Sequence, residues 1–226
     1  MTDLVTGTSP EAIRKAGWSI SIDGQLLENV GHVVIENPRF GRFSFGLRPE
    51  GTYGWGWKEV GGVGIVPWSI FKGKLLIGLV AQIRPFVRVS EYVMNIPRGF
   101  AKQAATFRES AAAEFREEVG LGGVEWPKRL EPLGDVATNA NSTFFDTTDG
   151  RGFQFFAFET KEEELETRDG AICFRRELVQ REVDPAEWIQ GCVFLPWESA
   201  ALVIDNFTSS GVARLLATKP ELKSFL

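Results

Sequence analysis

Apolar positions fall mostly into short extended runs, separated by turn residues such as Gly, Pro and Asn. Such runs are predicted at 18–22, 30–35, 40–47, 60–68, 74–83, 92–96, 130–137, 152–158 and 191–195. A helical spacing is predicted between Thr106 and Gly120 and over 196–204 and 208–217, with a short helix starting near Pro10. The acidic run 161–166 reads as a solvated loop. This order predicts an α+β fold, with a mixed sheet between helices.

Residues 1–57 are expected to form a small N-terminal antiparallel β appendage, and residues 58–226 the main domain. Few strands bury little surface, so the appendage should pack on the main domain or on a second subunit. Tyr53, Trp55 and Trp57 alternate along one side of an extended segment. Ordinary sheet packing and stacking on a substrate are both open for these aromatic residues.

The helix that follows Thr106 has clear signals at both of its ends. Thr106 suits the N-cap, and Glu109 three residues later completes a capping box. Gly120 fits the position just past the helix end, where a left-handed residue is needed. Phe115 and Val119 share a face that should pack inward.

Three carboxylates lie on another face of this helix. Glu114, Glu117 and Glu118 stand at i, i+3 and i+4. Each like-charge pair costs about 0.2–0.5 kcal/mol, and the helix dipole near the C-terminus adds about 0.3–1 kcal/mol per group. Arg116 points away from the cluster. Oxygen ligands favour a hard cation, Mg²⁺ first, with Mn²⁺ or Ca²⁺ as alternatives. The other interpretation of the three acids is a solvated acidic face of the helix, without a metal.

The segment from Asn95 to Leu121 resembles the Nudix box, G-x5-E-x7-R-E-U-x-E-E-x-G-U, in which U is a bulky apolar residue. The matching positions are Gly99, Glu114, Phe115, Glu117, Glu118, Gly120 and Leu121. Ala105 stands where the family has Glu, and Ala113 stands where it has an Arg that helps to orient the box carboxylates.

A second block, from Lys74 to Pro85, resembles the strand and Q-x-R-P turn of ADP-ribose pyrophosphatase-like Nudix enzymes. The resemblance covers about residues 58–218 and implies the Nudix fold. It implies that Mg²⁺ or Mn²⁺ binds the box acids and the carbonyl of Arg98. It further implies that Arg84, Arg98 and Gly99 contact the substrate, and that the N-terminal module joins a homodimer interface.

The predicted activity is Mg²⁺-dependent hydrolysis of the diphosphate linkage in a nucleoside diphosphate derivative, with ADP-ribose or a nucleotide sugar first. The catalytic residues are predicted to be Glu114, Glu117 and Glu118, with Glu117 as one candidate base. In ADP-ribose-cleaving relatives the base comes from a late loop, where Glu182 or Glu187 stands in this chain.

Two other functions are known for proteins that this resemblance brings in. Ala105 and Ala113 keep open a catalytically weak or inactive Nudix-fold protein that binds a nucleotide without cleaving it. An isoprenoid diphosphate isomerase would need catalytic Cys and metal-binding His residues, and His32 is the only histidine. The polar loop 139–143 lacks the Ser-Pro-Gly element that relatives with ADP-ribose activity often carry.

Composition narrows the range of partners. The chain has 226 residues, a hydrophobic share of 43% and a formal net charge of −5, without a dense Lys/Arg stripe, so a nucleic-acid partner is not expected. Cys173 and Cys192 suggest neither a disulfide framework nor a zinc site. Without an apolar leader or a long apolar run, a cytoplasmic protein that does not bind membranes is expected.

Overall fold

The structure is a computed structural model, and it divides the chain into two compact units. It describes residues 10–15, 17, 19, 21–22, 25–26, 33–37, 41–47, 53–59, 61–83, 92–102, 105–123, 125–134, 152–180 and 189–225. One unit comprises Met1–Gly61 with Thr143–Gly152, and the other comprises Gly62–Ser142 with Phe153–Leu226. Each unit is described by itself below.

The first unit contains a short helix and two small antiparallel sheets. Its elements are α1 (Pro10–Lys15), β1 (Ser21–Ile22), β2 (Gln25–Leu26), β3 (Val33–Asn37), β4 (Gly41–Leu47) and β5 (Tyr53–Glu59). Strand β1 pairs with β2, and β3, β4 and β5 pair in sequence order. Within the described residues, β1, β3 and β4 overlap the runs predicted at 18–22, 30–35 and 40–47, and Ser19 lies outside a strand. The boundary between an appendage and a main domain at residue 57 stays a prediction. The side chains of Tyr53, Trp55 and Trp57, and His32 as a whole, lie outside the described residues.

The second unit is built on a mixed sheet of nine strands among the described residues. They are β6 (Gly62–Phe71), β7 (Lys74–Ile83), β8 (Tyr92–Asn95), β9 (Arg98–Phe100), β10 (Leu130–Pro132), β11 (Phe153–Glu159), β12 (Leu165–Arg168), β13 (Ala171–Phe174) and β14 (Ile189–Pro196). The main order is β10-β11-β6-β7-β14-β13-β12, with β8 on β7 and β9 on β6. Strand β11 runs parallel to β6, and the other pairs are antiparallel.

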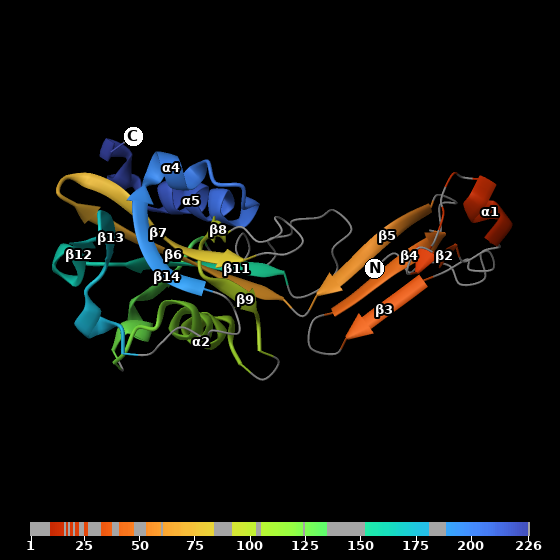
Figure 1. Cartoon of the computed structure of the whole chain (residues 1–226), viewed down its shortest axis with the longest axis horizontal. Coiled ribbons are helices and arrows are strands. Elements are labelled where there is room, and N and C mark those ends of the chain that lie inside the picture. The colour runs from red at the N-terminus through yellow and green to blue at the C-terminus, as the bar shows by residue number, and fades with distance from the viewer. Residues whose placement is uncertain are drawn as a thin grey trace. The chain divides into compact units, whose positions relative to one another are not determined.

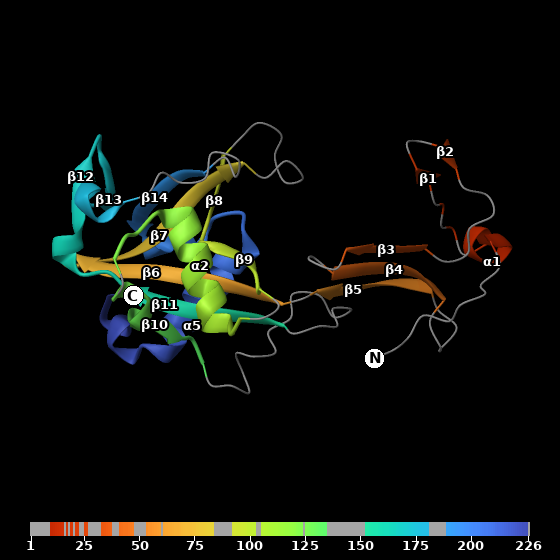
Figure 2. The same ribbon diagram turned by 90° about the horizontal axis from the view of Figure 1, so that it is seen from below.

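Helices cover both faces of this sheet. They are α2 (Phe107–Val119), α4 (Trp197–Ala201) and α5 (Asn206–Thr218), with 3₁₀ turns η1 (Trp126–Arg129), η2 (Glu162–Glu164), η3 (Arg176–Leu178) and η5 (Pro220–Phe225). Helix α2 lies on one side of the strands, and α4 and α5 lie on the other (Figures 1 and 2). The predicted α+β fold with a mixed sheet between helices is thus confirmed. In the described part of the chain, none of the helices combines the length and apolar character needed to span a bilayer.

Coverage on both faces explains the composition of β6. Positions Gly62 to Ser69 are all buried, and they read as a nearly continuous apolar run rather than as an alternation. Helix α5 approaches this strand closely at Gly211, because a Cβ there would lie 2.8 Å from Cγ2 of Val66. On the other face, Phe115 of α2 is fully buried, with its ring centroid 4.8 Å from that of Phe158.

Four local predictions need correction. Helix α5 begins at Asn206, two residues before the predicted start. The predicted helix 196–204 is shorter, since α4 ends at Ala201 and Asp205 starts α5 as its N-cap. The strand predicted from residue 130 to 137 is strand only over Leu130–Pro132 in its described part.

The acidic run 161–166 is more ordered than a solvated loop. It forms the turn η2 and enters strand β12, because both oxygens of Glu164 receive the Arg129 guanidinium at 2.7 Å. Burial opposes ionisation of Glu164, but the hydrogen bonds from Arg129 and from the Lys161 main chain outweigh it. The pKa of Glu164 therefore lies below its ordinary value.

Candidate functional site

The caps of α2 hold the acidic helix in place. Thr106 accepts a hydrogen bond from the main-chain N–H of Glu109 at 3.2 Å, and the Glu109 carboxylate accepts from the Thr106 N–H at 2.7 Å. The Thr106 hydroxyl also donates to the Glu109 carboxylate at 2.8 Å, and the two hydrogen bonds that this carboxylate accepts, from the Thr106 N–H and from the hydroxyl, lower the pKa of Glu109. Gly120 has φ of 78° and donates its N–H to the Arg116 carbonyl. The predicted capping box and left-handed glycine are both confirmed.

Glu118 is the acid that the fold buries. Its side chain belongs to a residue only 2% exposed, and its Oε2 accepts the main-chain N–H of Arg98 at 2.9 Å. Burying a carboxylate costs several kcal/mol unless hydrogen bonds and opposite charge compensate for it. The spacing of Glu118 from Glu114 and Glu117 along the chain does not reveal this burial, because the burial depends on where strand β9 lies.

Glu114 lies one helical turn before Glu118 and reaches the same strand. A Cβ built on Gly99 would lie 2.1 Å from Oε2 of Glu114 and 2.3 Å from its Cδ. The carboxylate therefore occupies the space that any larger residue at position 99 would need. The structure thus brings Glu114, Glu118, Arg98 and Gly99 together, all four of them predicted site residues.

The pairing of β9 with β6 sets the direction of the Arg98 main chain. Ile65 donates its N–H to the Pro97 carbonyl at 2.8 Å, and Gly64 stands opposite Arg98. In an antiparallel pair, hydrogen-bonded and non-hydrogen-bonded positions alternate, so Arg98 directs both its N–H and its C=O away from β6. The Arg98 N–H donates to Glu118, and the Arg98 carbonyl is directed to the same side of β9, away from β6.

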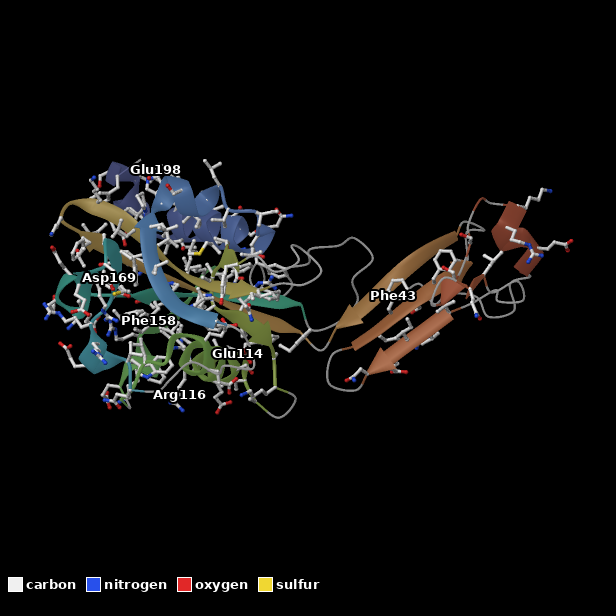
Figure 3. The ribbon with its side chains drawn as sticks, in the orientation of Figure 1. Phe43, Glu114, Arg116, Phe158, Asp169 and Glu198 are labelled. Atoms are coloured by element: carbon white, nitrogen blue, oxygen red, sulfur yellow. The ribbon has the colours of Figure 1, made fainter. Side chains whose placement is uncertain are left out.

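Glu117 has a different environment from its two neighbours. Its Oε1 lies 3.0 Å from Nζ of Lys102, in an ion pair whose side chains are 38% and 49% exposed. Arg116 is exposed, with its guanidinium carbon 5.7 Å from the Trp126 ring centroid, and Figure 3 shows it at the lower edge of α2. Sequence reasoning missed Lys102, since no pattern links it to a residue 15 positions later.

The side chain of Arg98 is held by α5. Its Nη2 lies 3.0 Å from Oδ1 of Asp205, and its guanidinium carbon lies 4.1 Å from the ring centroid of Phe207. Arg98 was predicted to contact the substrate, and in the structure its side chain already contacts Asp205 and Phe207. Arg84, Glu182 and Glu187 lie outside the described residues.

The donor set at β9 fits a hard divalent cation. Among the described residues, no group of three or more His, Cys, Asp or Glu side chains is placed to hold a metal ion. Mg²⁺, however, is commonly bound by one or two carboxylates together with waters and substrate phosphates. Glu114, Glu118 and the Arg98 carbonyl supply oxygen donors of this kind from one helix and one strand.

A cavity of about 820 Å³ opens beside the C-terminal end of α2. Its lining includes Val119, Arg176, Gln180 and Cys192. Burial raises the pKa of the Cys192 thiol, and nearby negative charge, including that of Glu118, adds to the effect. Cys192 and Cys173 are both free thiols. The neutral Cys192 thiol therefore acts as a small apolar wall of this cavity.

Comparison with known proteins does not assign this chain to a family. No family model matches it, and no curated protein matches its sequence. One solved structure, described as the crystal structure of an ADP compounds hydrolase, resembles it with a TM-score of 0.49 and 13% identity. That match covers 86% of this chain and 93% of the other. A likeness at this level assigns neither family nor activity, so the residues described above must support the function.

Proposed function

We propose that the protein hydrolyses the diphosphate linkage of a nucleoside diphosphate derivative in a Mg²⁺-dependent reaction, with ADP-ribose or a nucleotide sugar as the first candidates. The observation that carries this proposal is the meeting of two acids of α2 with β9. Glu118 is buried and accepts a hydrogen bond from the Arg98 N–H, and the Glu114 carboxylate lies against Gly99. The Nudix-box resemblance of the same residues supports the proposal.

The chemistry follows from the charge of the substrate. A diphosphate brings several negative oxygens, which would be repelled by a helix bearing three carboxylates. Mg²⁺ bound by Glu114, Glu118 and the Arg98 carbonyl would neutralise that charge and acidify a bound water. In the hydrolysis, a water oxygen would form a bond to phosphorus while the bond from phosphorus to the bridging oxygen breaks, and a carboxylate of the protein would accept the proton of that water.

Three glutamates are candidates for the proton-accepting carboxylate, one on α2 and two in a later segment of the chain. Glu117 lies on the correct helix, but it must exchange its Lys102 partner for the attacking water before it can act as a base. Glu182 or Glu187 is the other choice, and neither lies among the described residues. Measuring the pH dependence of turnover in variants of all three would identify the base.

The cavity beside α2 is a candidate for the organic part of the substrate. Its volume of about 820 Å³ lies within the usual range of small-molecule sites, roughly 300–1,000 Å³. Its lining includes Val119, the residue after Glu118, and the positively charged Arg176. A substrate with its diphosphate at β9 therefore has a place for a neighbouring group.

One observation favours a second function, a protein that binds a nucleotide without cleaving it. Lys102 already neutralises Glu117 at 3.0 Å, so the third acid of the helix is engaged without a metal. Such a protein would be stabilised by a nucleoside diphosphate and would release no product.

The test is incubation of the purified chain with Mg²⁺ and a panel of nucleoside diphosphate derivatives. Glu118→Gln removes the charge and keeps the shape, so it should lower turnover by about 100-fold or more, since metal charge stabilisation contributes several kcal/mol. Glu163→Gln, on an exposed acid of η2, is the control and should keep wild-type turnover. Thermal stabilisation by the nucleotide without product would support the second function instead.

A further inference from the structure

The segment from Ile96 to Arg98, which carries the β9 end of the candidate site, is also fixed from α5. The Ile96 N–H donates to Oγ1 of Thr208 at 2.9 Å. The Thr208 hydroxyl donates to Oδ2 of Asp205 at 2.8 Å, and Oδ1 of Asp205 accepts from Nη2 of Arg98 at 3.0 Å. The Asp205 carboxylate is thus linked to both ends of this three-residue segment, directly to Arg98 and through Thr208 to Ile96.

Arg98 connects the two helix layers of the sheet. Its side chain meets Asp205 at the N-terminus of α5, and its main-chain N–H meets Glu118 of α2. Helices α5 and α2 lie on opposite sides of the strands (Figure 1). A displacement of the Arg98 main chain would therefore move the donor that orients the buried Glu118 carboxylate.

The pair is built to hold one geometry. The side chains of Arg98 and Asp205 are only 20% and 9% exposed, and the guanidinium also packs on the Phe207 ring. Limited exposure reduces screening by water and salt, and packing of the planar guanidinium on the Phe207 ring restricts its orientation. The pair therefore fixes the position of Arg98 more firmly than a surface ion pair of similar length would.

Capping of α5 explains only part of what Asp205 does. Its Oδ2 accepts the Thr208 N–H at 2.9 Å, which is an ordinary N-cap hydrogen bond. Asn serves as an N-cap about as well as Asp, so the cap itself does not need the negative charge. The charge of Asp205 acts on Arg98, through the other oxygen.

We propose that Asp205, acting through Arg98, is a positioning residue for the Glu118 carboxylate and thereby for divalent-cation binding at β9. The cation-binding part of this inference rests on the proposed function. The positioning of Glu118 does not, because it concerns only contacts among the protein groups themselves.

The experiment compares Asp205→Asn with the wild type in the full-length chain. Mn²⁺ serves as the probe, titrated by electron paramagnetic resonance without substrate, and amide hydrogen exchange at Arg98 is measured without metal. The variant should raise the Mn²⁺ midpoint by about tenfold or more, the usual effect of losing a residue that orients a metal ligand. The Arg98 amide should exchange faster, because its contact with Glu118 loosens.

Glu164→Gln is the matched control. It breaks another partly buried Arg–carboxylate pair, in which Arg129 also packs on a Phe ring, and neither residue of this pair belongs to β9, α2 or α5. It should lower stability without moving the Mn²⁺ midpoint or the exchange of the Arg98 amide. Arg98→Lys keeps the charge but loses the planar guanidinium that packs on the Phe207 ring, so it should give an intermediate midpoint.

Two results overturn the positioning role. One is an Asp205→Asn variant whose Arg98 amide exchanges at the wild-type rate. The other is a midpoint shift in Asp205→Asn no larger than in Glu164→Gln. If the wild type itself binds no Mn²⁺, the proposed function fails, and the exchange of the Arg98 amide alone decides whether Asp205 positions Glu118.

Discussion

Gly99→Ala separates the candidate site from the stability of the fold. The new Cβ would lie 2.1 Å from Oε2 of Glu114, whereas ordinary contact begins at 3.4 Å, so the carboxylate must withdraw by about 1.3 Å. The obstacle is the flexible end of a side chain, and the backbone of Gly99 is not in the left-handed region. Ala is therefore tolerated by the fold but displaces a predicted metal ligand.

The expected changes have different sizes. A misplacement of about 1 Å at a reacting centre can cost about 100-fold, equal to about 2.7 kcal/mol, so Mn²⁺ affinity and turnover should fall strongly. Replacing Gly by Ala lowers the conformational entropy of the unfolded chain, which by itself stabilises the fold by about 0.4–1 kcal/mol. The free energy of unfolding should therefore change by less than about 1 kcal/mol. Mn²⁺ titration and urea unfolding of the same sample measure both quantities.

Gly78→Ala is the opposite case and serves as a control. Its Cβ would lie 2.8 Å from Cβ of Pro67, an atom next to the backbone, so it should cost about 1–3 kcal/mol of stability while Mn²⁺ affinity stays at the wild-type level. In a Glu114→Ala background, Gly99→Ala should have no further effect on affinity. Wild-type Mn²⁺ binding by Gly99→Ala itself would refute the assignment of Glu114 as a ligand.

Three further outcomes are expected. Lys102→Gln frees Glu117 from a competing cation 3.0 Å away, so half-saturation with Mg²⁺ should need less metal, and an unchanged midpoint would place Glu117 outside the site. Thr106→Ala removes the N-cap of α2 and should lower the free energy of unfolding by about 1 kcal/mol, measured by urea unfolding. Glu164 has a lowered pKa in the folded chain beside Arg129, so its stabilisation is present above the unfolded value of about 4.3 and is lost as pH falls through the folded value. The stability gap between wild type and Glu164→Gln should therefore narrow below about pH 4.3, and a gap independent of pH would contradict this linkage.

Local signals predicted the acidic helix well. Thr106, Glu109 and Gly120 act through contacts within one or two turns, so their residue types alone fix where α2 begins and ends. The turn at Lys72 and Gly73 between β6 and β7 was predictable for the same reason. By contrast, the start of α5 was predicted two residues late, although Asp205 followed by Thr208 is itself a recognisable capping pattern.

Contacts between distant segments were beyond the reach of those signals. Spacing placed Glu114, Glu117 and Glu118 on one face, but it could not show that Glu118 is buried on β9 while Glu117 meets Lys102 near the surface. The packing of strand β9 under α2 decides that difference.

By itself, the sequence determined the order of most strands and helices, the ends of α2 and the presence of three acids along it, because periodicity and capping act over a few residues. The strands β9, β12 and β13 were not among the predicted runs. Only the tertiary structure decided which acids reach β9 and that Arg98 joins Asp205 to Glu118. The physical reason is that hydrogen bonds and ion pairs across 20 or 107 positions of the chain depend on how the sheet and its helices pack, which no local pattern records.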